Sequence, residues 1–188
     1  MVSQKLRGRY TRWSQTYDRT AQMWEYRTPA VLASRMRELL PTSSRILDCA
    51  CGTGLNGPHY PGASLFGADA TLAMTIHTRS RGYRSCVSDA RALPYLDDTF
   101  DAVLCTAMLD QYRTIAPFVR EMARVVRPDG LVAFTTFCDR EERQHLPLRD
   151  IREVLVQSNM HLVETFRYAS HHGVGCPTTF FRATIAQK

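Results

Sequence analysis

The chain has 188 residues, of which 44% are hydrophobic and 22% charged, and its formal net charge is +6. This length fits one domain of ordinary size, and the apolar fraction is sufficient for a core. No apolar run approaches the roughly 20 residues of a membrane-spanning helix, and the first residues lack the apolar segment of a secretory signal. We therefore expect one cytoplasmic domain over residues 1–188 and exclude a membrane-spanning protein.

The first 44 residues contain no strand pattern. We expect one or two helices there, which pack as a lid segment across the ligand-binding edge of the sheet or on one of its faces. Basic and aromatic residues alternate in this segment: Arg7, Arg9, Arg12, Arg19 and Arg27 stand among Tyr10, Trp13, Tyr17, Trp24 and Tyr26. Such a pattern is typical of segments that stack on single-stranded nucleic acid and of amphipathic segments that pack on their own domain. We favour the second interpretation.

From residue 45 onward, short β-rich runs alternate with helical periods, which predicts an α/β fold with a mostly parallel sheet and helices on both faces. The expected strands are 45–48, 65–69, 85–88, 100–105, 131–137, 162–166 and 179–185. Apolar spacing predicts helices over 31–40, 118–126 and 148–158, and turn residues at 127–130 end the second of these. A glycine-containing loop at 171–175 separates the last two strands, so we expect them to form an antiparallel hairpin.

The six cysteines are scattered, unlike the CxxC pairs of zinc sites or the spaced cysteines of secreted disulfide scaffolds. Only Cys49 and Cys51 are close in sequence. A redox or metal-binding role is one interpretation of this pair, and burial as small apolar side chains is the other. We favour burial and expect no metal site.

A glycine-rich segment at residues 48–57 follows the first predicted strand, and the second strand ends in Asp69. The carboxyl edge of a parallel sheet is where such folds bind nucleotides, and glycines there let ligand atoms approach the backbone. A carboxylate at Asp69 can accept hydrogen bonds from both hydroxyls of a ribose. The two strand ends therefore predict a nucleoside-binding site.

Two frames fit the glycine-rich segment. Residues 52–57 match the dinucleotide pattern GxGxxG, which requires a helix whose N-terminus faces a pyrophosphate. Pro58 and Pro61 leave room for one or two helical turns at most. The other frame, DxAxGxG, begins with Asp48, whose charge would repel a pyrophosphate and attract the positive end of the methionine group of S-adenosylmethionine (SAM). We favour the SAM frame.

Four blocks resemble, in order and spacing, the class I SAM-dependent methyltransferases, and specifically the broad methyltransferase type 11 group: ILDCACGTGLN, LFGADAT, SDARALPYLDDTFDAVLC and EMARVVRPDGLVAF. They extend over about residues 45–137. The segment TYDRTAQMWE also resembles the tyrosine-bearing N-terminal helix that often covers the cofactor in this family. Ala50 stands where most members have the first glycine of the motif, and we expect it to need only a negative φ. The resemblance implies a Rossmann-like, seven-stranded methyltransferase fold and SAM as the cofactor.

The resemblance also implies which residues contact the cofactor. They are Tyr17, Asp48, Ala50, Cys51, Gly52, Thr53, Gly54, Asp69, Ala70, Asp89, Ala90, Cys105 and Thr106. The methionine end would lie against Asp48 and the segments 52–54 and 105–107, with Tyr17 as a cap on its carboxylate.

On the nucleoside side, Asp69 would hold the ribose. Asp89 would accept a hydrogen bond from the adenine amino group, and Ala90 would give a backbone contact. Asp89 could also cap a helix that begins at Ala90, and these two roles are compatible.

Methyl transfer depends on in-line approach more than on a strong base, although an oxygen nucleophile benefits from a general base. The histidines near strand ends are His59, His145, His171 and His172, and each is more often a surface or packing residue. We choose His145 as the candidate base, because it follows the fifth strand where related enzymes bind acceptors, and Tyr10 as the second catalytic candidate. Residues that could shape the acceptor pocket are Tyr10, Trp13, Tyr112 and Arg113.

These observations predict a SAM-dependent methyltransferase (EC 2.1.1.-) that acts on a small-molecule acceptor, as a monomer or homodimer. Residues 136–151 contain no inserted subdomain, which favours a compact acceptor or an open site for a larger one. Three alternatives stay open: an enzyme that uses SAM for cyclisation or rearrangement, a nucleic-acid or lipid-headgroup methyltransferase, and a non-catalytic SAM-binding subunit. The arginine excess permits the second of these, but we favour the small molecule over nucleic acid.

Overall fold

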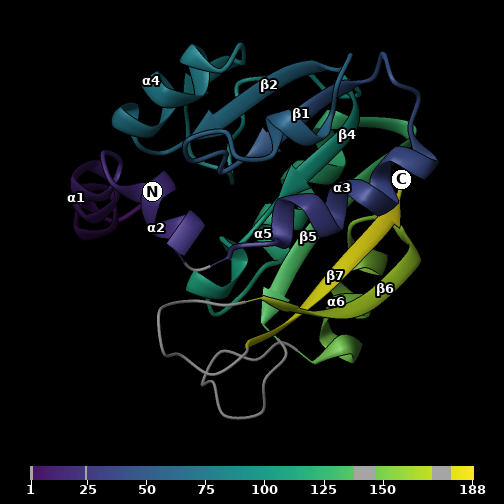
Figure 1. The fold of residues 1–188 in the computed structure, drawn as a ribbon. Coiled ribbons are helices and arrows are strands. Elements are labelled where there is room, and N and C mark those ends of the chain that lie inside the picture. The colour runs from purple at the N-terminus through teal and green to yellow at the C-terminus, as the bar shows by residue number, and fades with distance from the viewer. Residues whose placement is uncertain (1, 24, 138–146, 171–178) are drawn as a thin grey trace.

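Seven strands form one sheet in the order β3-β2-β1-β4-β5-β7-β6 (Figure 1). The computed structural model describes residues 2–23, 25–137, 147–170 and 179–188. The strands are β1 (Arg45–Cys49), β2 (Ser64–Asp69), β3 (Arg84–Val87), β4 (Phe100–Cys105), β5 (Val126–Phe137), β6 (His161–Ser170) and β7 (Thr179–Gln187). Each predicted strand is therefore confirmed, with ends that differ by zero to five residues.

Strands β1 to β5 are parallel, and β7 lies between β5 and β6 and runs antiparallel to both. This confirms the mostly parallel sheet and the C-terminal antiparallel hairpin. The central strand β1 is buried along its last four residues, as expected for a parallel strand covered on both faces.

Strand β5 begins earlier than the sequence predicts. Val126 already pairs with Phe100, and after a shift of register Leu131 pairs with Ala102. The expected turn at 127–130 is therefore a bulge within the strand, and it is held by two backbone hydrogen bonds of 3.2 Å to Lys188 at the end of β7. The expectation that the preceding helix continues to Val126 was wrong for the same reason, because this residue belongs to the sheet.

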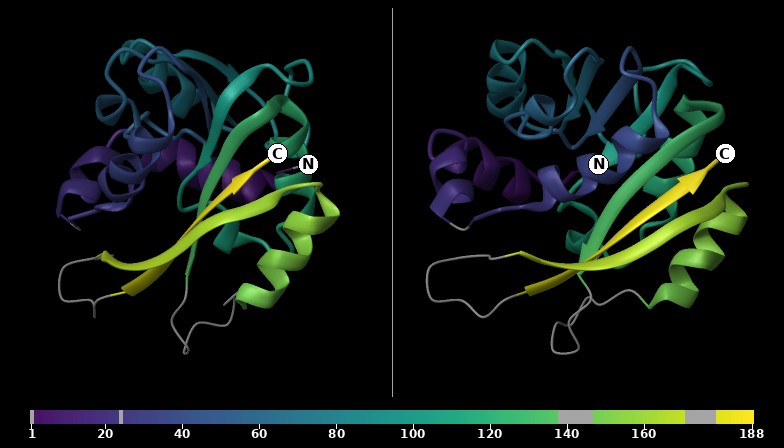
Figure 2. Two further views of the ribbon diagram at one scale, coloured as in Figure 1. Left: turned by 90° about the vertical axis from the view of Figure 1, so that its right-hand side faces the viewer. Right: turned by 45° about the vertical axis from the view of Figure 1, so that its right-hand side comes forward.

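Six α-helices accompany the sheet in the described part of the chain: α1 (Gln4–Trp13), α2 (Tyr17–Met23), α3 (Thr28–Leu39), α4 (Leu72–Ser80), α5 (Ala116–Val125) and α6 (Leu148–Gln157). Helices α3 and α4 lie on one face of the sheet, and α5 and α6 lie on the other (Figure 2). Single turns of 3₁₀-helix at Gly57–His59 and Leu109–Gln111 follow β1 and β4. No described helix is both long and apolar enough to cross a bilayer.

The N-terminal 44 residues form three helices, not the expected one or two. A turn at Ser14–Thr16 separates α1 from α2, and Thr28-Pro29 begins α3, where proline fits because the first helical turn needs no donor at that nitrogen. Helix α4 was not predicted at all.

Apolar side chains on the two faces build two clusters. On one face, Leu32 and Met36 of α3 pack on the sheet, and on the other face Phe118 and Met122 of α5 do so. All four are at most 2% exposed, and burying each side chain of this kind contributes about 1.5–3 kcal/mol. These clusters hold the strand ends in place, where the candidate site lies.

Strand β3 forms one edge of the sheet. Its carbonyl at Ser85 accepts two hydrogen bonds, of 3.1 and 2.8 Å, from the guanidinium of Arg79 in α4. The helix therefore covers part of the hydrogen-bonding edge of the strand.

Candidate functional site

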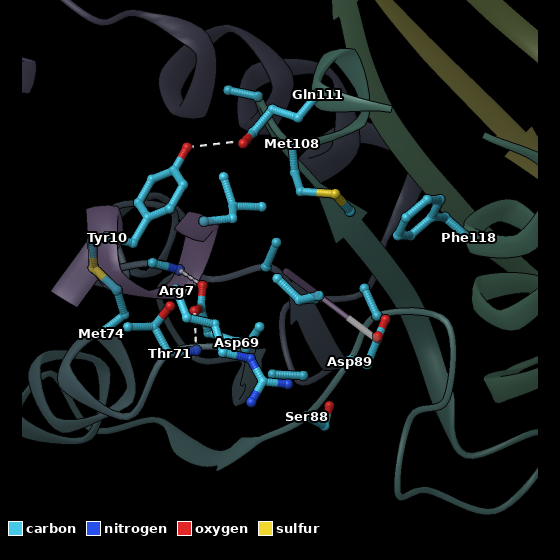
Figure 3. Close-up of a pocket in the computed structure, with 18 of the residues that line it drawn as sticks. Arg7, Tyr10, Asp69, Thr71, Met74, Ser88, Asp89, Met108, Gln111 and Phe118 are labelled. Carbon is cyan, nitrogen blue, oxygen red and sulfur yellow. Dashed lines mark hydrogen bonds between the residues drawn. The ribbon is translucent and has the colours of Figure 1, made fainter. Parts of the chain in front are cut away.

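A pocket opens at the carboxyl ends of β1, β2 and β4, and helix α1 forms its opposite wall (Figure 3). Its empty space is about 680 Å³ with the open mouth included. Its lining consists of Val2, Leu6, Arg7, Tyr10, Tyr17, Ala50, Gly52, Ala68, Asp69, Ala70, Thr71, Met74, Ser88, Asp89, Ala90, Thr106, Ala107, Met108, Gln111, Tyr112 and Phe118. Residues far apart in sequence thus meet at one sheet edge, as the parallel topology requires.

The loop after β1 turns sharply into the pocket. Ala50, Gly52 and Gly54 have φ angles of +60°, +51° and +88°. The expectation of a negative φ at Ala50 was therefore wrong. The left-handed backbone at Ala50 is needed because the next residue folds back on β2, where the Cys51 amide donates to the carbonyl of Ala68 at 3.1 Å.

The conformation of this loop excludes the dinucleotide-binding pattern GxGxxG as the function of residues 52–57. Only one 3₁₀ turn follows the glycines, so no helix N-terminus is presented to a pyrophosphate. Gly57, the third glycine of that pattern, serves packing instead: a Cβ there would lie 2.7 Å from the ring of Tyr83.

Asp69 faces the pocket at the end of β2. One carboxylate oxygen accepts from the Gly52 amide at 3.0 Å and the other accepts from the Thr71 amide at 2.8 Å. These bonds fix the orientation of the carboxylate, and each oxygen keeps a lone pair for a further donor. Burial raises the pKa of Asp69 above its ordinary value, although the two amides oppose that shift. Both oxygens can therefore receive hydroxyl groups from a ligand.

Asp48 does not line the pocket and is 1% exposed. Its two oxygens accept from Asn56 at 3.0 Å and from the Tyr83 hydroxyl at 3.3 Å. Burial raises the pKa of Asp48 to about 7. The amide of Asn56 also donates to the Thr106 hydroxyl at 3.2 Å, and Thr106 does line the pocket. Asp48 is thus connected to the pocket lining by a chain of hydrogen bonds through Asn56 to Thr106.

Asp89 lies in a turn, since no helix follows it. The alternative role of Asp89, as the cap of a helix at Ala90, is therefore excluded. It instead holds Arg91 through two hydrogen bonds of 2.9 and 2.7 Å, and it accepts from the Arg91 amide at 3.0 Å. These bonds lower the pKa of Asp89 to about 2, so the carboxylate beside the pocket stays ionised.

Aromatic side chains of α1 and α2 face the pocket. The ring of Trp13 lies 5.7 Å from that of Tyr10 and 4.9 Å from that of Tyr17, and both tyrosines line the pocket. The Tyr10 hydroxyl accepts a 3.0 Å hydrogen bond from Gln111, the residue that ends the turn after β4 (Figure 3). Burial raises the pKa of both Tyr10 and Tyr17. Both phenols are therefore protonated at neutral pH.

Eleven of the residues predicted from sequence line the pocket: Tyr10, Tyr17, Ala50, Gly52, Asp69, Ala70, Asp89, Ala90, Thr106, Ala107 and Tyr112. Seven others do not line it: Trp13, Asp48, Cys51, Thr53, Gly54, Cys105 and Arg113. His145, His171, His172 and Trp24 lie outside the described residues. His59 is half-buried on the 3₁₀ turn and does not line the pocket.

Cys49, Cys51 and Cys105 are at most 6% exposed, which confirms the interpretation as buried small side chains. In the described part of the chain, no three His, Cys, Asp or Glu side chains gather as metal ligands would.

Sequence reasoning missed several lining residues, above all Arg7, Thr71, Met74 and Gln111. Figure 3 shows Arg7 reaching from α1 into the pocket on the side of Asp69 and Ser88. Its spacing from Tyr10 along one helix is the signal that could have identified it. Gln111 carries a second feature: its buried side-chain oxygen has no hydrogen-bond partner among the described residues.

The sheet order, the loop after β1 and the acid that ends β2 together define the fold of class I methyltransferases. Two solved structures agree with this. The [4+2]-cyclase SpnF superposes with a TM-score of 0.79 at 17% identity, over 99% of this chain and 96% of its own. The magnesium protoporphyrin IX methyltransferase of Synechocystis PCC 6803, with bound S-adenosylhomocysteine (SAH), gives 0.75 at 14% identity, over 95% of this chain and 93% of its own.

Residues 47–134 match the family model described as methyltransferase domain, in agreement with the resemblance of the sequence to class I, SAM-dependent methyltransferases. Methyltransferase-like protein 27 of Homo sapiens is 33% identical over 145 residues, which are 72% of this chain and 58% of that protein. The chain spans about half the length of the curated relatives that it matches.

Proposed function

We propose that the protein binds SAM in this pocket and transfers its methyl group to a small-molecule acceptor. The orientation of Asp69 carries this proposal, because its two oxygens are aimed by backbone amides and remain open to the two hydroxyls of a ribose. The left-handed loop at Ala50 and Gly52 supports it, since this conformation brings bare backbone to the pocket surface. The residues present therefore fit an adenosine-containing ligand.

When bound, SAM supplies a methyl group made electrophilic by its sulfonium charge. In this proposal Asp69 holds the ribose, and Asp89, which Arg91 keeps ionised, accepts from the adenine amino group. Thr106 and Tyr17 lie at the amino-acid end, and the buried charge of Asp48 favours the cationic ligand through Asn56. Proximity and exclusion of water then supply most of the rate enhancement.

Tyr10 would act on the acceptor as a hydrogen-bond donor, not as a base. Its hydroxyl accepts from Gln111 and keeps its own proton, because burial raises its pKa. The candidate base His145 lies outside the described residues and stays a prediction, as do the cytoplasmic location and the monomeric or dimeric state.

We further propose that α1 and α2 form a mobile lid over the cofactor. Helix α1 has no buried residue, whereas α3 buries Leu32 and Met36 in the core, so we confine the lid to residues 4–23. Hydrogen exchange of this segment should slow when SAH is added. Unchanged exchange at saturating SAH would show a fixed wall in place of a lid.

The direct test is calorimetry with SAM, SAH and NAD, followed by mass spectrometry of the products formed from SAM and candidate acceptors. We expect SAM and SAH to bind with micromolar affinity, about −7 to −8 kcal/mol, and NAD not to bind. Binding of NAD without SAM would overturn the proposal.

A second candidate is an enzyme of this fold with a different reaction. One neighbour that superposes over 99% of this chain is named a [4+2]-cyclase, so the fold alone does not imply methyl transfer. Mass spectrometry distinguishes the two reactions. An acceptor heavier by one methylene, formed together with SAH, indicates methyl transfer. An isomerised product with intact SAM indicates the second candidate reaction.

A further inference from the structure

Helix α1 has two faces of different character. Leu6, Tyr10 and Trp13 point inward, where the first two line the pocket and the third packs between the tyrosine rings. Lys5, Arg9 and Arg12 follow at the same spacing and are exposed. Positions i, i+4 and i+7 share one side of a helix, so these three cations form a single outward stripe.

This cationic stripe has no acidic counterpart. The first 17 residues contain no Asp or Glu, and none of the three cations makes an ion pair within the described ranges. The nearest acid along the chain, Asp18, is already paired with Arg81. By contrast, Arg35 and Arg124 each pair with two acids. The stripe is therefore available to an external anion.

The neighbouring helix adds apolar groups. Helix α4 contacts α1, and the two lie side by side at the same end of the molecule (Figures 1 and 2). Leu72 and Ile76, one turn apart on α4, are 58% and 56% exposed. Together they add a small exposed apolar surface to this end of the molecule.

We propose that the outer sides of α1 and α4 dock the protein on an anionic lipid bilayer. Lys5, Arg9 and Arg12 would meet the headgroups, and Leu72 and Ile76 would enter the region beneath them. A basic stripe on one helix and exposed aliphatic groups on a helix that contacts it form the combination that interfacial segments use. Because α1 also forms a wall of the pocket, docking would place the pocket mouth beside the bilayer.

Nucleic acid fits this surface less well. The rings of Tyr10 and Trp13 that could stack on bases face the interior, and a phosphate backbone offers no apolar phase to Leu72 and Ile76. This docking does not depend on the proposed function, so either can fail without the other.

The test is co-sedimentation of the full chain with vesicles of phosphatidylcholine alone and of phosphatidylcholine mixed with phosphatidylglycerol. We expect binding to the anionic vesicles only, and a loss of at least about tenfold in high salt, since three surface charges contribute. The triple variant Lys5→Gln, Arg9→Gln, Arg12→Gln should lose this binding. The matched control Arg37→Gln, Arg120→Gln, Arg152→Gln removes the same charge from other exposed positions and should retain it.

The double variant Leu72→Ser, Ile76→Ser should weaken binding to anionic vesicles and leave its salt dependence unchanged. Equal loss in both triple variants would reduce the effect to net charge and overturn the proposal. Binding to duplex nucleic acid or polyglutamate but not to anionic vesicles would overturn it as well. The salt titration of the unmodified chain gives a result even if a variant fails to fold.

Discussion

The Thr53 hydroxyl in the loop after β1 donates a 2.6 Å hydrogen bond to Asp18 in α2. Arg81 strengthens this contact, because it donates to the Thr53 carbonyl at 2.7 Å and also pairs with Asp18. Helix α2 is thereby fastened to the glycine loop, and Tyr17, the residue before Asp18, is held at the pocket. Thr53 does not line the pocket, so its contribution to ligand binding runs through α2.

A double-mutant cycle tests that connection. Asp18→Ala and Thr53→Val should each weaken SAH binding by about 1–2 kcal/mol, and the double variant should lose little more than either single one, because both remove the same contact. Calorimetry of the four proteins gives the coupling energy. Arg19→Ala, an exposed change on the same helix, should leave the affinity unchanged. Additive losses would show that the two residues act separately.

Replacing Asp69 by Ala should reduce the affinity for SAH at least tenfold. The change removes two charge-assisted hydrogen bonds to the ribose, each worth roughly 1.5–3 kcal/mol, and frees the Gly52 and Thr71 amides. The strand-end position predicts that the fold survives, which circular dichroism checks. Asp97→Ala, whose side chain is 70% exposed, serves as the control. An unchanged dissociation constant for Asp69→Ala would place the ribose elsewhere.

Asp48→Asn should stabilise the ligand-free protein and weaken SAM binding. Burial raises the pKa of Asp48 to about 7, whereas it is about 3.9 in an unfolded chain. Between these values the folded state binds more protons, so the free energy of unfolding falls as pH rises through this window and stays lower above it. Asp48→Asn has no carboxyl group to titrate at this position, so its free energy of unfolding does not fall in this window. In urea denaturation the variant should exceed the unmodified chain most near about pH 8 and not at all near about pH 4.

The same titration predicts a pH-dependent affinity. Binding of the cationic ligand favours ionised Asp48, so SAM should bind more tightly near about pH 8 than near about pH 6 and release a proton on binding. The raised pKa of the neighbouring Asp69 acts in the same direction. Calorimetry in buffers of different ionisation enthalpy measures the proton release. Asp48→Asn should reduce it, and an unaltered release would assign the proton to Asp69 alone.

Ala50→Gly should raise the free energy of unfolding by about 0.5–1 kcal/mol. The φ of +60° at Ala50 costs an alanine about 1–2 kcal/mol, and the greater freedom of glycine in the unfolded chain offsets part of the gain. Ala70→Gly is the matched control, because Ala70 has no positive φ and the change should destabilise. A destabilised Ala50→Gly protein would contradict the strain that we infer.

The seven strands and the positions of Asp48 and Asp69 could be predicted from sequence because they depend on local patterns: an apolar run, a turn, and an acid at a fixed place. Helix α4 could not, since Leu72 and Ile76 are exposed while Thr75 and Thr78 are buried. Its apolar spacing is thus the reverse of an amphipathic helix, and the expected signal is missing.

The details of the site depend on contacts between distant segments. Gln111 meets Tyr10 across 101 positions, and no spacing rule predicts such a pair. Likewise, Asn56 and Tyr83 donate hydrogen bonds to the buried Asp48, and the strand pattern does not predict where these two residues lie. Sequence therefore predicted the edge of the sheet that carries the pocket and part of its lining, but not the contacts between distant segments that complete it.

The two hydrogen bonds from the Arg79 guanidinium to the Ser85 carbonyl affect how the protein can associate with a second copy of itself. An exposed strand with open carbonyls invites a strand from a second copy, and β3 ends the sheet with Val87 still 47% exposed. Because one guanidinium takes up both acceptor sites of that carbonyl, an incoming strand would have to displace a charged group to extend the ladder. Part of the arginine excess of this chain thus protects it from edge-to-edge aggregation.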